Sequence, residues 1–366
     1  MLTRQMKTTL KIKLCPDEMQ FKALKATMEA FNSACNDISK VAFAQKCFSK
    51  FSLQRIVYHD LKKKYGLSAQ LVIRAIGKVI DACKRCKGKE VEFKIHGAIV
   101  YDQRIMAFKK LQAVSLSSLE GRLVIPIVLG GYQTMRMKHT KGQADLVLID
   151  NTFYLLATVD TPEPPTEITS KNIGVDLGIV NIATDSTGES FSGKKVEAVR
   201  RRYFKLRQAL QSRGTKSAKR HLKKNRRKEG LFRRDVNHCI SKKIVEKAKR
   251  TKSNIVLEEL TGIRDRTRVR KSQRAQRDGW SFAQLRQFVE YKSKLNAVKV
   301  IMIDPRNTSR ECSVCGYTDK KNRKSQAEFC CLSCGHSENA DMNAAKVICK
   351  RGYVNSPIVP DDRKVA

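Results

Sequence analysis

Two Cys-x-x-Cys-Gly motifs near the end of the chain constrain its local fold more than any other feature. The motifs are CSVCG and CLSCG, and 15 residues lie between their cysteine pairs. Four thiolates at this spacing are typical of a tetrahedral structural Zn²⁺ site, and the glycine after each pair permits the tight turn that brings two sulfurs together. The expected zinc ligands are Cys312, Cys315, Cys331 and Cys334. We therefore predict a closed zinc ribbon, with a short β-hairpin in the segment TDKKNRKSQAEF between the motifs.

Other residues of the same chemical types offer alternatives to this ligand set. Cys330 adjoins the third ligand but has the wrong spacing to the fourth, and His336 is a weaker substitute. Unligated thiols or a redox pair are the alternatives to zinc itself. Cys83 and Cys86 form another CxxC, but they lie in a helical pattern with no second pair nearby. We interpret that spacing as a coincidence.

The charge of the chain points to a polyanionic partner. Its 366 residues include 74 Lys and Arg against 35 Asp and Glu, which gives a formal net charge of +39. Such an excess repels itself, and nucleic acid is the partner that best accounts for it, whereas an acidic small molecule would not require it. The 41% of hydrophobic residues suffices for buried cores, so disorder can only be local.

About half of the excess charge lies in one stretch. Residues 194–250 hold 23 Lys or Arg and four Asp or Glu, a net charge of +19. Their apolar residues recur at helical spacing, which predicts basic helices with interruptions near Gly214 and Gly230. Candidate phosphate contacts in this stretch are Lys223, Lys224, Arg226 and Arg227. A second basic run, residues 264–277, has few apolar residues and is predicted to be a loop that orders on nucleic acid.

The first half of the chain divides by pattern into strands and helices. KTTLKIK at residues 7–13 alternates as a strand, and the chain from Pro16 to about residue 88 has helical spacing. Four short β-rich runs follow, VEFKI, RLVIPIVL, ADLVLID and TFYLLATV, and they predict a barrel-like module. If the first strand pairs with these later ones, the helical block is an insertion into the module. The proline-rich residues 161–171 predict a linker.

Three acidic residues occupy special positions: two lie in or beside apolar strands, where a charge is costly, and one lies where a helix is expected to begin. Asp176 lies inside the apolar strand pattern IGVDLG, and Glu258 follows the apolar run in NIVLEEL. Glu259 is the adjacent alternative on the opposite face of that strand, while Asp341 lies where a helix is expected to begin. A buried structural acid or a helix N-terminal charge would explain each one singly. In so basic a chain they together predict a divalent-cation site for in-line phosphodiester hydrolysis.

Several motifs carry a resemblance to a known family. GVDLG, IVLEEL, DPRNTSRECSVCG, KKNRKSQAEF, CLSCG and NADMNAAKVI occur in this order over about residues 170–350. In this respect the chain resembles the transposon-encoded TnpB proteins, the ancestors of compact type V CRISPR effectors. The resemblance implies a fold of α/β, all-β and all-α parts: an RNase H-like RuvC domain with an inserted zinc ribbon, preceded by a wedge β-barrel with a helical recognition insertion. The implied boundaries are 1–14 and 90–168 for the wedge barrel, 15–89 for the insertion, 169–309 for the RuvC-like domain, 310–337 for the ribbon, 338–352 for the third RuvC motif and 353–366 for the tail.

The resemblance also implies an activity. It is RNA-guided cleavage of double-stranded DNA beside a short target-adjacent motif, with Asp176, Glu258 and Asp341 as the catalytic acids that hold Mg²⁺. Mn²⁺ is the alternative metal, because both ions accept carboxylate oxygens. The implied partners are a guide RNA from the transposon end and the DNA target, with one protein chain per RNA favoured. Residues that match a family motif and are expected to contact nucleic acid or support the site are Arg306, Thr308, Ser309 and Arg310.

Two other functions stay open on the sequence. One is a non-cleaving RNA-guided regulator or transposition accessory protein, which the three intact acids disfavour. The other is a protein-only nuclease or strand transferase that uses the same acids without RNA. No apolar run has the length of a signal peptide or approaches the roughly 18 residues of a membrane span, so we expect no membrane partner and a prokaryotic cytoplasmic, nucleoid-associated location.

Overall fold

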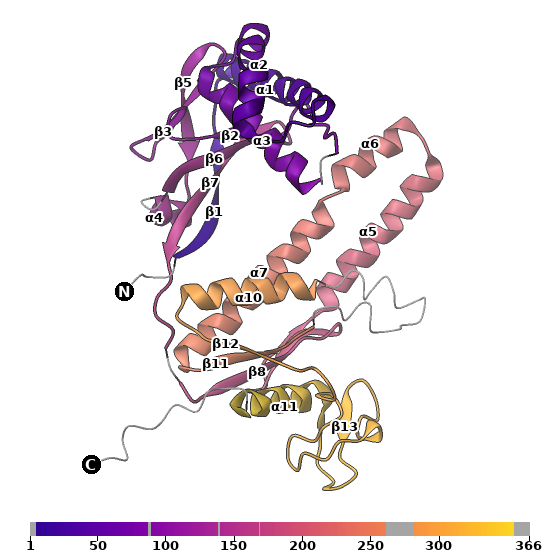
Figure 1. Cartoon of the computed structure of the whole chain (residues 1–366). Helices are drawn as coiled ribbons and strands as arrows, with labels where there is room; N and C mark the ends of the chain where they lie inside the picture. Colours follow the sequence, from indigo (N-terminus) through magenta and orange to yellow (C-terminus); the bar gives the residue numbers. More distant parts are fainter. Residues whose placement is uncertain (1–4, 87–88, 138–139, 168, 261–280, 355–366) are drawn as a thin grey trace, which may run out of the picture. The chain divides into compact units, whose positions relative to one another are not determined.

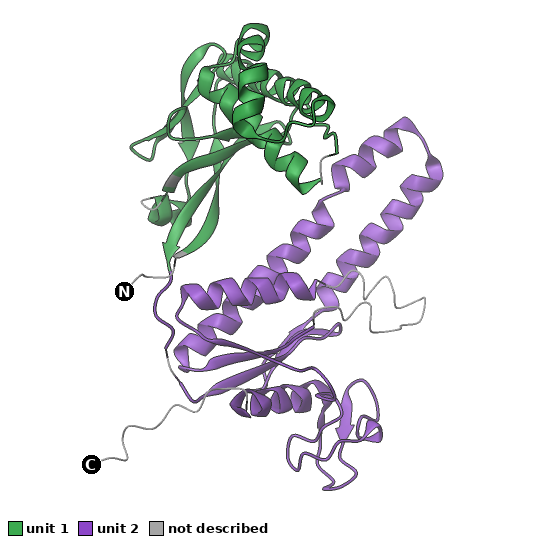
Figure 2. Cartoon of the chain, in the orientation of Figure 1, with its two compact units in different colours: residues 1–162 green, residues 163–366 purple. Residues whose placement is uncertain are grey.

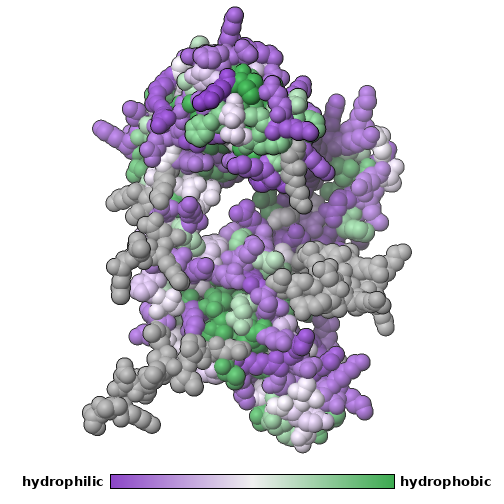
Figure 3. Space-filling view, viewed as in Figure 1, coloured by the Kyte–Doolittle hydropathy of each residue, from purple (hydrophilic) through white to green (hydrophobic). Residues whose placement is uncertain are grey.

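The computed structural model describes residues 5–86, 89–137, 140–167, 169–260 and 281–354. The chain divides into two compact units, residues 1–162 and 163–366 (Figures 1 and 2). The predicted basic loop at 264–277 and Trp280 lie outside the described residues. Within the described parts, none of the helices combines the length and the apolar character needed to span a bilayer. Most of the face seen in Figure 3 is hydrophilic, as the high charge requires.

Unit 1 contains a seven-stranded antiparallel sheet in the order β2-β6-β7-β1-β5-β4-β3. Its strands are β1 (Gln5–Leu14), β2 (Ile99–Tyr101), β3 (Met106–Lys109), β4 (Ala113–Ser118), β5 (Gly121–Val128), β6 (Thr140–Ile149) and β7 (Thr152–Pro162), and a short helix α4 (Gly131–Arg136) follows β5. The sheet curls into a nearly closed barrel, where the Tyr101 hydroxyl of β2 donates a hydrogen bond of 2.8 Å to the Ser117 carbonyl of β4. The prediction of a barrel-like module is therefore confirmed.

Strand β1 joins the two ends of unit 1. It pairs with β7, with Leu10 opposite Ala157, and with β5, with Lys13 opposite Val128. Three helices lie in sequence between β1 and β2: α1 (Glu18–Ala44), α2 (Lys50–Tyr65) and α3 (Ala69–Arg85). The side chain of Asp17 caps α1 by accepting from the Gln20 backbone N–H at 2.8 Å. The helical block thus interrupts a single sheet, and its apolar faces share one core with β1 and β7.

One predicted β run is wrong. VEFKI at residues 91–95 belongs to no strand: residues 91–94 have no regular secondary structure and a turn begins at Ile95. Side chains of α1 take backbone hydrogen bonds of this run. Asn36 accepts from the Phe93 N–H at 2.7 Å and donates to the Phe93 carbonyl at 3.1 Å, while the Ser39 hydroxyl accepts from the Val91 N–H at 3.0 Å. An alternating pattern cannot distinguish a strand partner from a helix that offers polar side chains.

Unit 2 is built on a five-stranded mixed sheet in the order β10-β9-β8-β11-β12. Its strands are β8 (Asn172–Asp176), β9 (Asn181–Asp185), β10 (Ser190–Ser192), β11 (Asn254–Glu258) and β12 (Val300–Ile303). The pairs β8–β11 and β11–β12 are parallel, whereas β9 and β10 are antiparallel to their neighbours. Helix α11 (Ala340–Val354) covers one face, while α7 (Lys228–Arg250) and α10 (Phe282–Leu295) cover the other (Figure 1).

The basic stretch of unit 2 is helical, as predicted. It forms α5 (Lys194–Arg213), α6 (Lys216–Asn225) and α7, and α5 and α6 extend away from the sheet (Figure 1). Gly214 ends α5 with a φ of 63°, a left-handed conformation that glycine adopts without strain. The second interruption, expected near Gly230, falls a few residues earlier at Arg226 and Arg227, and Gly230 itself lies inside the first turn of α7. A glycine with no positive φ and no close neighbour is tolerated within a helix.

Glycine is required where α11 crosses β8. A Cβ atom on Gly174 would lie 2.2 Å from the Ala345 carbonyl oxygen and 2.4 Å from the Cys349 backbone nitrogen. Both atoms belong to the backbone of α11 and cannot move aside as a flexible side chain does. The close approach fixes the distance between the end of β8 and the start of α11, where Asp176 and Asp341 lie.

We expect Gly174→Ala to lower the free energy of unfolding by about 1–3 kcal/mol, because the added methyl overpacks the contact with α11. The matched control is Gly230→Ala, at a helical position with no atom within 4 Å, and it should be neutral or stabilise by up to about 1 kcal/mol. Denaturant unfolding of the full chain measures both. Equal stability of the two variants would contradict this account of the helix-to-strand contact.

Candidate zinc ribbon and acidic site

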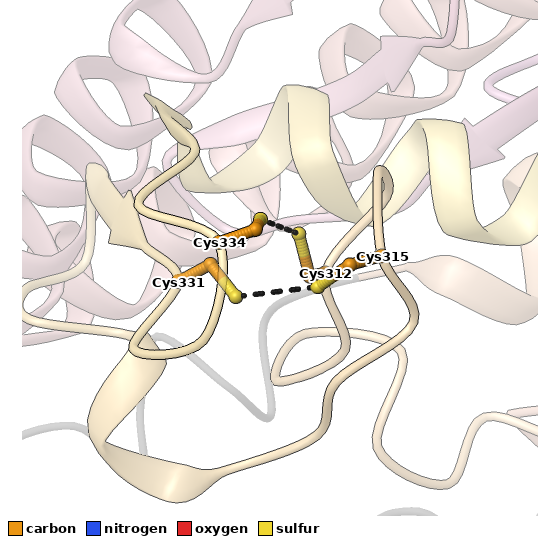
Figure 4. Close-up of side chains that lie close together, drawn as sticks. All are labelled: Cys312, Cys315, Cys331 and Cys334. Carbon is orange, nitrogen blue, oxygen red and sulfur yellow. Dashed lines mark hydrogen bonds between the residues drawn. The ribbon is translucent and has the colours of Figure 1, made fainter.

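The four cysteines of the two motifs converge as predicted. Their Sγ atoms all lie within 4.8 Å of one another, and they face a common centre from two separate loops (Figure 4). The Sγ atoms of Cys312 and Cys334 are 3.7 Å apart, and those of Cys315 and Cys331 are 3.5 Å apart. A tetrahedral site with Zn–S bonds of about 2.3 Å would place its sulfurs about 3.8 Å apart. The cluster therefore fits a structural zinc ion with no free position for a substrate.

The two loops that carry the cysteines repeat one backbone geometry. In the first, the Gly316 N–H donates to the Cys312 carbonyl at 3.0 Å, and in the second the Gly335 N–H donates to the Cys331 carbonyl at 3.0 Å. The two glycines have φ values of 77° and 71°, which explains why glycine follows each CxxC. Backbone N–H groups of Cys334 and Ser333 lower the pKa of the Cys331 thiol to about 6. The backbone N–H of His336 would lower the pKa of the Cys334 thiol, but hydrogen bonds with the other three thiols of the cluster raise it to about 12. The four sulfurs therefore share protons, which a bound zinc ion would displace.

The expected hairpin lies elsewhere in the ribbon. Strand β13 (Glu328–Cys330) pairs with β14 (Ser337–Asn339), so the hairpin encloses the second cysteine loop and is not confined to the segment between the motifs. Between the motifs the structure has a 3₁₀ turn η2 (Lys320–Asn322). The buried Asn322 amide donates to the Arg310 and Tyr317 carbonyls at 2.9 and 3.2 Å and accepts from the Leu332 N–H at 3.0 Å, which joins the two loops.

The alternative thiols and the histidine lie outside the cluster. Cys330 is the last residue of β13, and the ring of His336 lies 3.4 Å from the Glu338 carboxylate. Cys83 is buried in α3, and Cys86 is the residue that ends that helix. Among the described residues, the four predicted cysteines are the group of potential metal ligands that meets the 4.8 Å spacing.

The three predicted acids lie near one another in unit 2. Asp176 ends β8 and Glu258 ends β11, two parallel strands that are direct neighbours, while Asp341 lies in the first turn of α11. Residues Gly174 and Val256 contact α11, so strand alternation turns Asp176 and Glu258 toward the same helix. The acids are 82 and 83 residues apart in sequence. The sheet and the crossing of α11 over it bring them near one another.

The charges of the other two acids affect the pKa of Asp176. Burial and the charges of Glu258 and Asp341 raise the pKa of Asp176 to about 8, although the Arg323 charge opposes the rise. Burial also raises the pKa of Glu258, against the hydrogen bond from Thr308 and the charge of Arg351. Among the described groups, the carboxylates do not meet the 4.8 Å spacing of the cysteines. A cluster of this kind favours protons or a divalent cation as a counter-charge.

Each of the other two acids is held by specific partners. The Thr308 hydroxyl donates to the buried Glu258 carboxylate. The Asn181 side-chain amide donates to Asp341 at 2.9 Å, and the Arg323 guanidinium, from the ribbon, lies 3.7 Å from Asp341. A cavity of about 250 Å³ adjoins Glu258 on the side of α10. Glu258 and Asp341 are therefore each held by a hydrogen bond, and open space adjoins Glu258.

Glu259 lies on the other side of β11. Its carboxylate forms an ion pair with Arg286 of α10, away from the face that α11 covers. The structure therefore groups Glu258 with Asp176 and Asp341, and it leaves Glu259 in a separate ion pair. The sequence had left this choice open.

The residues predicted to contact nucleic acid have two kinds of environment. In the basic stretch, the predicted residues Lys223, Lys224, Arg226 and Arg227 are exposed. In the motif that follows β12, Arg306 and Arg310 are exposed. Ser309 is partly buried. Thr308 is 4% exposed and contacts Glu258, so it supports the acidic site. The partners Asn181 and Arg323 were missed, because no spacing rule connects them with Asp341.

Two family models match adjacent parts of the chain. The OrfB_IS605 model, described as a probable transposase, covers residues 154–263, and the model of the Cas12f1-like TNB domain covers residues 282–348. The first match includes β8 and β11, and the second includes the ribbon and most of α11. The acids are thus divided between the two matched segments.

The chain is similar in sequence to two bacterial proteins and similar in fold to a chain in a solved complex. The chain is 34% identical over 252 residues to "CRISPR-associated endodeoxyribonuclease Cas12f1" of Sulfoacidibacillus thermotolerans, a match that covers 62% of this chain and 58% of that protein. It is 26% identical over 275 residues to "Putative RNA-guided DNA endonuclease InsQ" of Escherichia coli, with 68% and 66% covered. The fold resembles the chain in the cryo-EM structure of a Cas12f1-sgRNA-target DNA complex, with a TM-score of 0.65 at 11% identity and with 94% and 99% covered. The matched part spans less than two thirds of the first of these relatives.

We expect Cys331→Ser to lose bound zinc and to unfold the ribbon, because three thiolates hold the ion far less tightly than four. Cys330→Ser is the matched control, one residue away and outside the cluster, and it should keep the full zinc content. Elemental analysis of the purified proteins measures bound zinc. Zinc loss in the Cys330 variant with retention in the Cys331 variant would reassign the ligand.

The raised pKa of Asp176 predicts a pH dependence of stability. The folded pKa of about 8 lies above the ordinary value of 3.8, so the folded protein binds the extra proton and its stability falls as pH rises between about 4 and 8. Asp176→Asn removes this penalty. Without added Mg²⁺, the variant should therefore melt at a higher temperature than the wild type, by a margin that grows toward pH 8.

Asp185 on β9 provides a control of opposite sign. Burial would raise its pKa, but hydrogen bonds from Lys247 and Thr187 outweigh burial and lower it. Such a group stabilises the fold above its unfolded pKa, and the stabilisation is lost as pH falls. Asp185→Asn should therefore melt at a lower temperature at neutral pH. A difference for Asp176→Asn that does not vary with pH would contradict the proposed repulsion.

Proposed function

Because this chain belongs to the TnpB (OrfB_IS605) family, we propose that it is an RNA-guided, divalent-metal-dependent DNA endonuclease of a mobile element. The observation that carries the proposal is the meeting of Asp176, Glu258 and Asp341, from three separate elements, in a chain with a net charge of +39. A structural role does not explain why burial and the charges of Glu258 and Asp341 act together on Asp176 to raise its pKa. Binding to a polyanion explains the charge.

We propose that unit 2 is an RNase H-like RuvC nuclease domain. Three features support this: the mixed sheet order, the acids at the ends of two parallel strands, and a third acid on the helix that covers them. In the proposed division the nuclease domain is 169–309 with its third motif at 338–352, and the ribbon is 310–337. The barrel of unit 1, 1–14 and 90–168, is the wedge, and 15–89 is the recognition insertion.

The residues of the site have distinct proposed roles in hydrolysis. Asp176, Glu258 and Asp341 would hold Mg²⁺, or Mn²⁺, which supplies Lewis-acid stabilisation of the phosphodiester and activation of the attacking water. Thr308 orients Glu258, and Asn181 orients Asp341. Arg323 brings a positive charge from the ribbon to the acids, where it offsets their repulsion and can contact a phosphate oxygen. We propose in-line attack by water, with inversion at phosphorus and no covalent enzyme intermediate.

The nucleic-acid partners follow from charge and surface. We propose that the exposed Lys and Arg of α5, α6 and α7 hold the backbone of the guide RNA and its duplex with target DNA, since pairing with the guide supplies the sequence readout. In unit 1, an open polar cleft lies between α3 and the barrel, where Asp102 accepts hydrogen bonds from Gln70 and Arg74. Amide and guanidinium groups suit contacts to base edges, so we propose that this cleft reads the target-adjacent motif.

We expect Glu258→Gln and Asp176→Ala to reduce guided DNA cleavage by about 1000-fold or more, because each removes a member of a site that acts as a unit. Glu259→Gln is the matched control on the next residue, and it should cleave at close to the wild-type rate. RNA and target binding should survive in all three variants. Cleavage that persisted in Asp176→Ala would refute the site.

The first experiment identifies the RNA. The protein is expressed with its native flanking DNA and purified through a high-salt wash, and the bound RNA is sequenced. A discrete RNA from the transposon end would support RNA guidance and provide the guide for cleavage tests in buffers with and without Mg²⁺. Random host RNA would favour the protein-only nuclease or the accessory role. A discrete guide with binding but no cleavage in Mg²⁺ would favour the regulator.

A further inference from the structure

A single arginine near the end of α11 holds the loop between β12 and the ribbon. The Arg351 Nη1 atom donates to the Asp304 carbonyl at 3.1 Å and to the Arg306 carbonyl at 2.8 Å, and its Nη2 atom binds the Glu311 carboxylate. The side chain is 26% exposed, so most of it is removed from water. A planar guanidinium can bridge three acceptors in this way, and a lysine ammonium on a flexible stem cannot fix the same geometry.

The loop that Arg351 holds also supports the acidic site. Within residues 304–311, the Asn307 carbonyl accepts from the Arg310 and Glu311 N–H groups at 2.8 and 3.0 Å, which makes a compact turn. Thr308 lies inside this turn, and its hydroxyl donates to Glu258. The Thr308 hydroxyl also lies 3.1 Å from the Pro305 carbonyl. Arg351 binds residues on both sides of Thr308, so it holds the loop that carries this hydroxyl.

The same helix anchors the ribbon. The Asn343 amide donates to the Glu311 carbonyl at 2.7 Å and accepts from the Ser313 N–H at 2.9 Å, on either side of the first zinc cysteine. Arg351 and Asn343 thus hold the two ends of the segment from β12 to the ribbon. Asp341 lies on this helix too, so one rigid element sets the positions of two acids and of the ribbon.

We propose that Arg351 is a positioning residue for the metal centre, which acts through the 304–311 loop and the Thr308 hydroxyl to orient Glu258. This inference rests on the proposed function, because it requires that Glu258 bind a divalent cation. Arg351 makes no hydrogen bond to any of the three acids in the described contacts, so its hydrogen bonds reach Glu258 only through the loop and Thr308. Its charge also lowers the pKa of Glu258 directly, but loss of a positive charge beside the centre would by itself favour a bound cation, which is opposite to the loss of affinity expected here. Partners that orient ligands in this way typically change metal affinity or activity by about 10- to 100-fold.

The test measures Mn²⁺ binding directly, by calorimetry on the zinc-loaded full chain, beside guided cleavage at varied Mg²⁺. The variants are Arg351→Ala, Thr308→Val and the double variant, and the controls are Thr308→Ser, which keeps the hydroxyl, and Lys350→Ala, which removes an exposed charge from the same helix. We expect each of the first two to weaken Mn²⁺ binding about 10- to 100-fold and to raise the Mg²⁺ needed for half-maximal cleavage. Lys350→Ala should bind like the wild type, and Thr308→Ser should lose less affinity than Thr308→Val, because it retains the hydroxyl that donates to Glu258.

The double variant decides whether Arg351 acts through Thr308. If it does, the double variant loses no more affinity than the weaker-binding single variant, because the second change removes an interaction that is already lost. Arg351→Lys should fall between the wild type and Arg351→Ala.

Losses that multiply in the double variant would overturn the proposal, as would an Arg351→Ala protein that melts earlier but binds Mn²⁺ normally. If the Arg351 variants do not fold, normal Mn²⁺ binding by Thr308→Val would overturn it alone. If the wild type binds no Mn²⁺, the proposed metal centre is refuted. If the wild type binds Mn²⁺ and the variants bind it equally well, only the role of Arg351 is refuted.

Discussion

The repulsion among three buried or partly buried carboxylates is the constraint on which unit 2 depends. Asp176, Glu258 and Asp341 come from two strands and a helix, and burial together with the charges of Glu258 and Asp341 raises the pKa of Asp176 to about 8. Such a cluster destabilises the folded chain unless the surrounding packing holds it in place. The close contact of α11 with Gly174 does so, since it fixes the helix against the strand at backbone distance.

The zinc ribbon contributes a positive charge that offsets the repulsion among the acids. The ribbon supplies Arg323, whose charge opposes the rise in the Asp176 pKa and lies 3.7 Å from Asp341. Asn322, the residue before it, joins the two cysteine loops through hydrogen bonds to both. The position of this cationic side chain therefore depends on the fold of the cysteine cluster. Loss of zinc should reach the acidic site through this link even though no cysteine touches an acid.

The sequence predicted the parts of this arrangement that follow from local chemistry. Cysteine spacing identified the four sulfurs, and a charge within an apolar strand identified Asp176, since each signal comes from neighbours in the chain. Partners such as Asn181 and Arg323 lie 160 and 18 residues from Asp341, and no periodicity connects them. The VEFKI run was mistaken for a strand because its hydrogen-bond partners are side chains of α1. Long-range polar pairing was the information that local patterns lacked.

The distribution of charge explains why an acidic centre suits so basic a chain. In the proposed function, a field from 39 excess positive charges would draw nucleic acid toward the protein, but the three acids would repel the phosphate to be cleaved. A divalent cation between carboxylates and phosphate turns that repulsion into attraction on both sides. The basic helices would then retain the nucleic acid without metal, whereas hydrolysis would need it. In the proposed nuclease, the acids would confine hydrolysis to one place on a surface whose basic side chains would bind phosphates elsewhere.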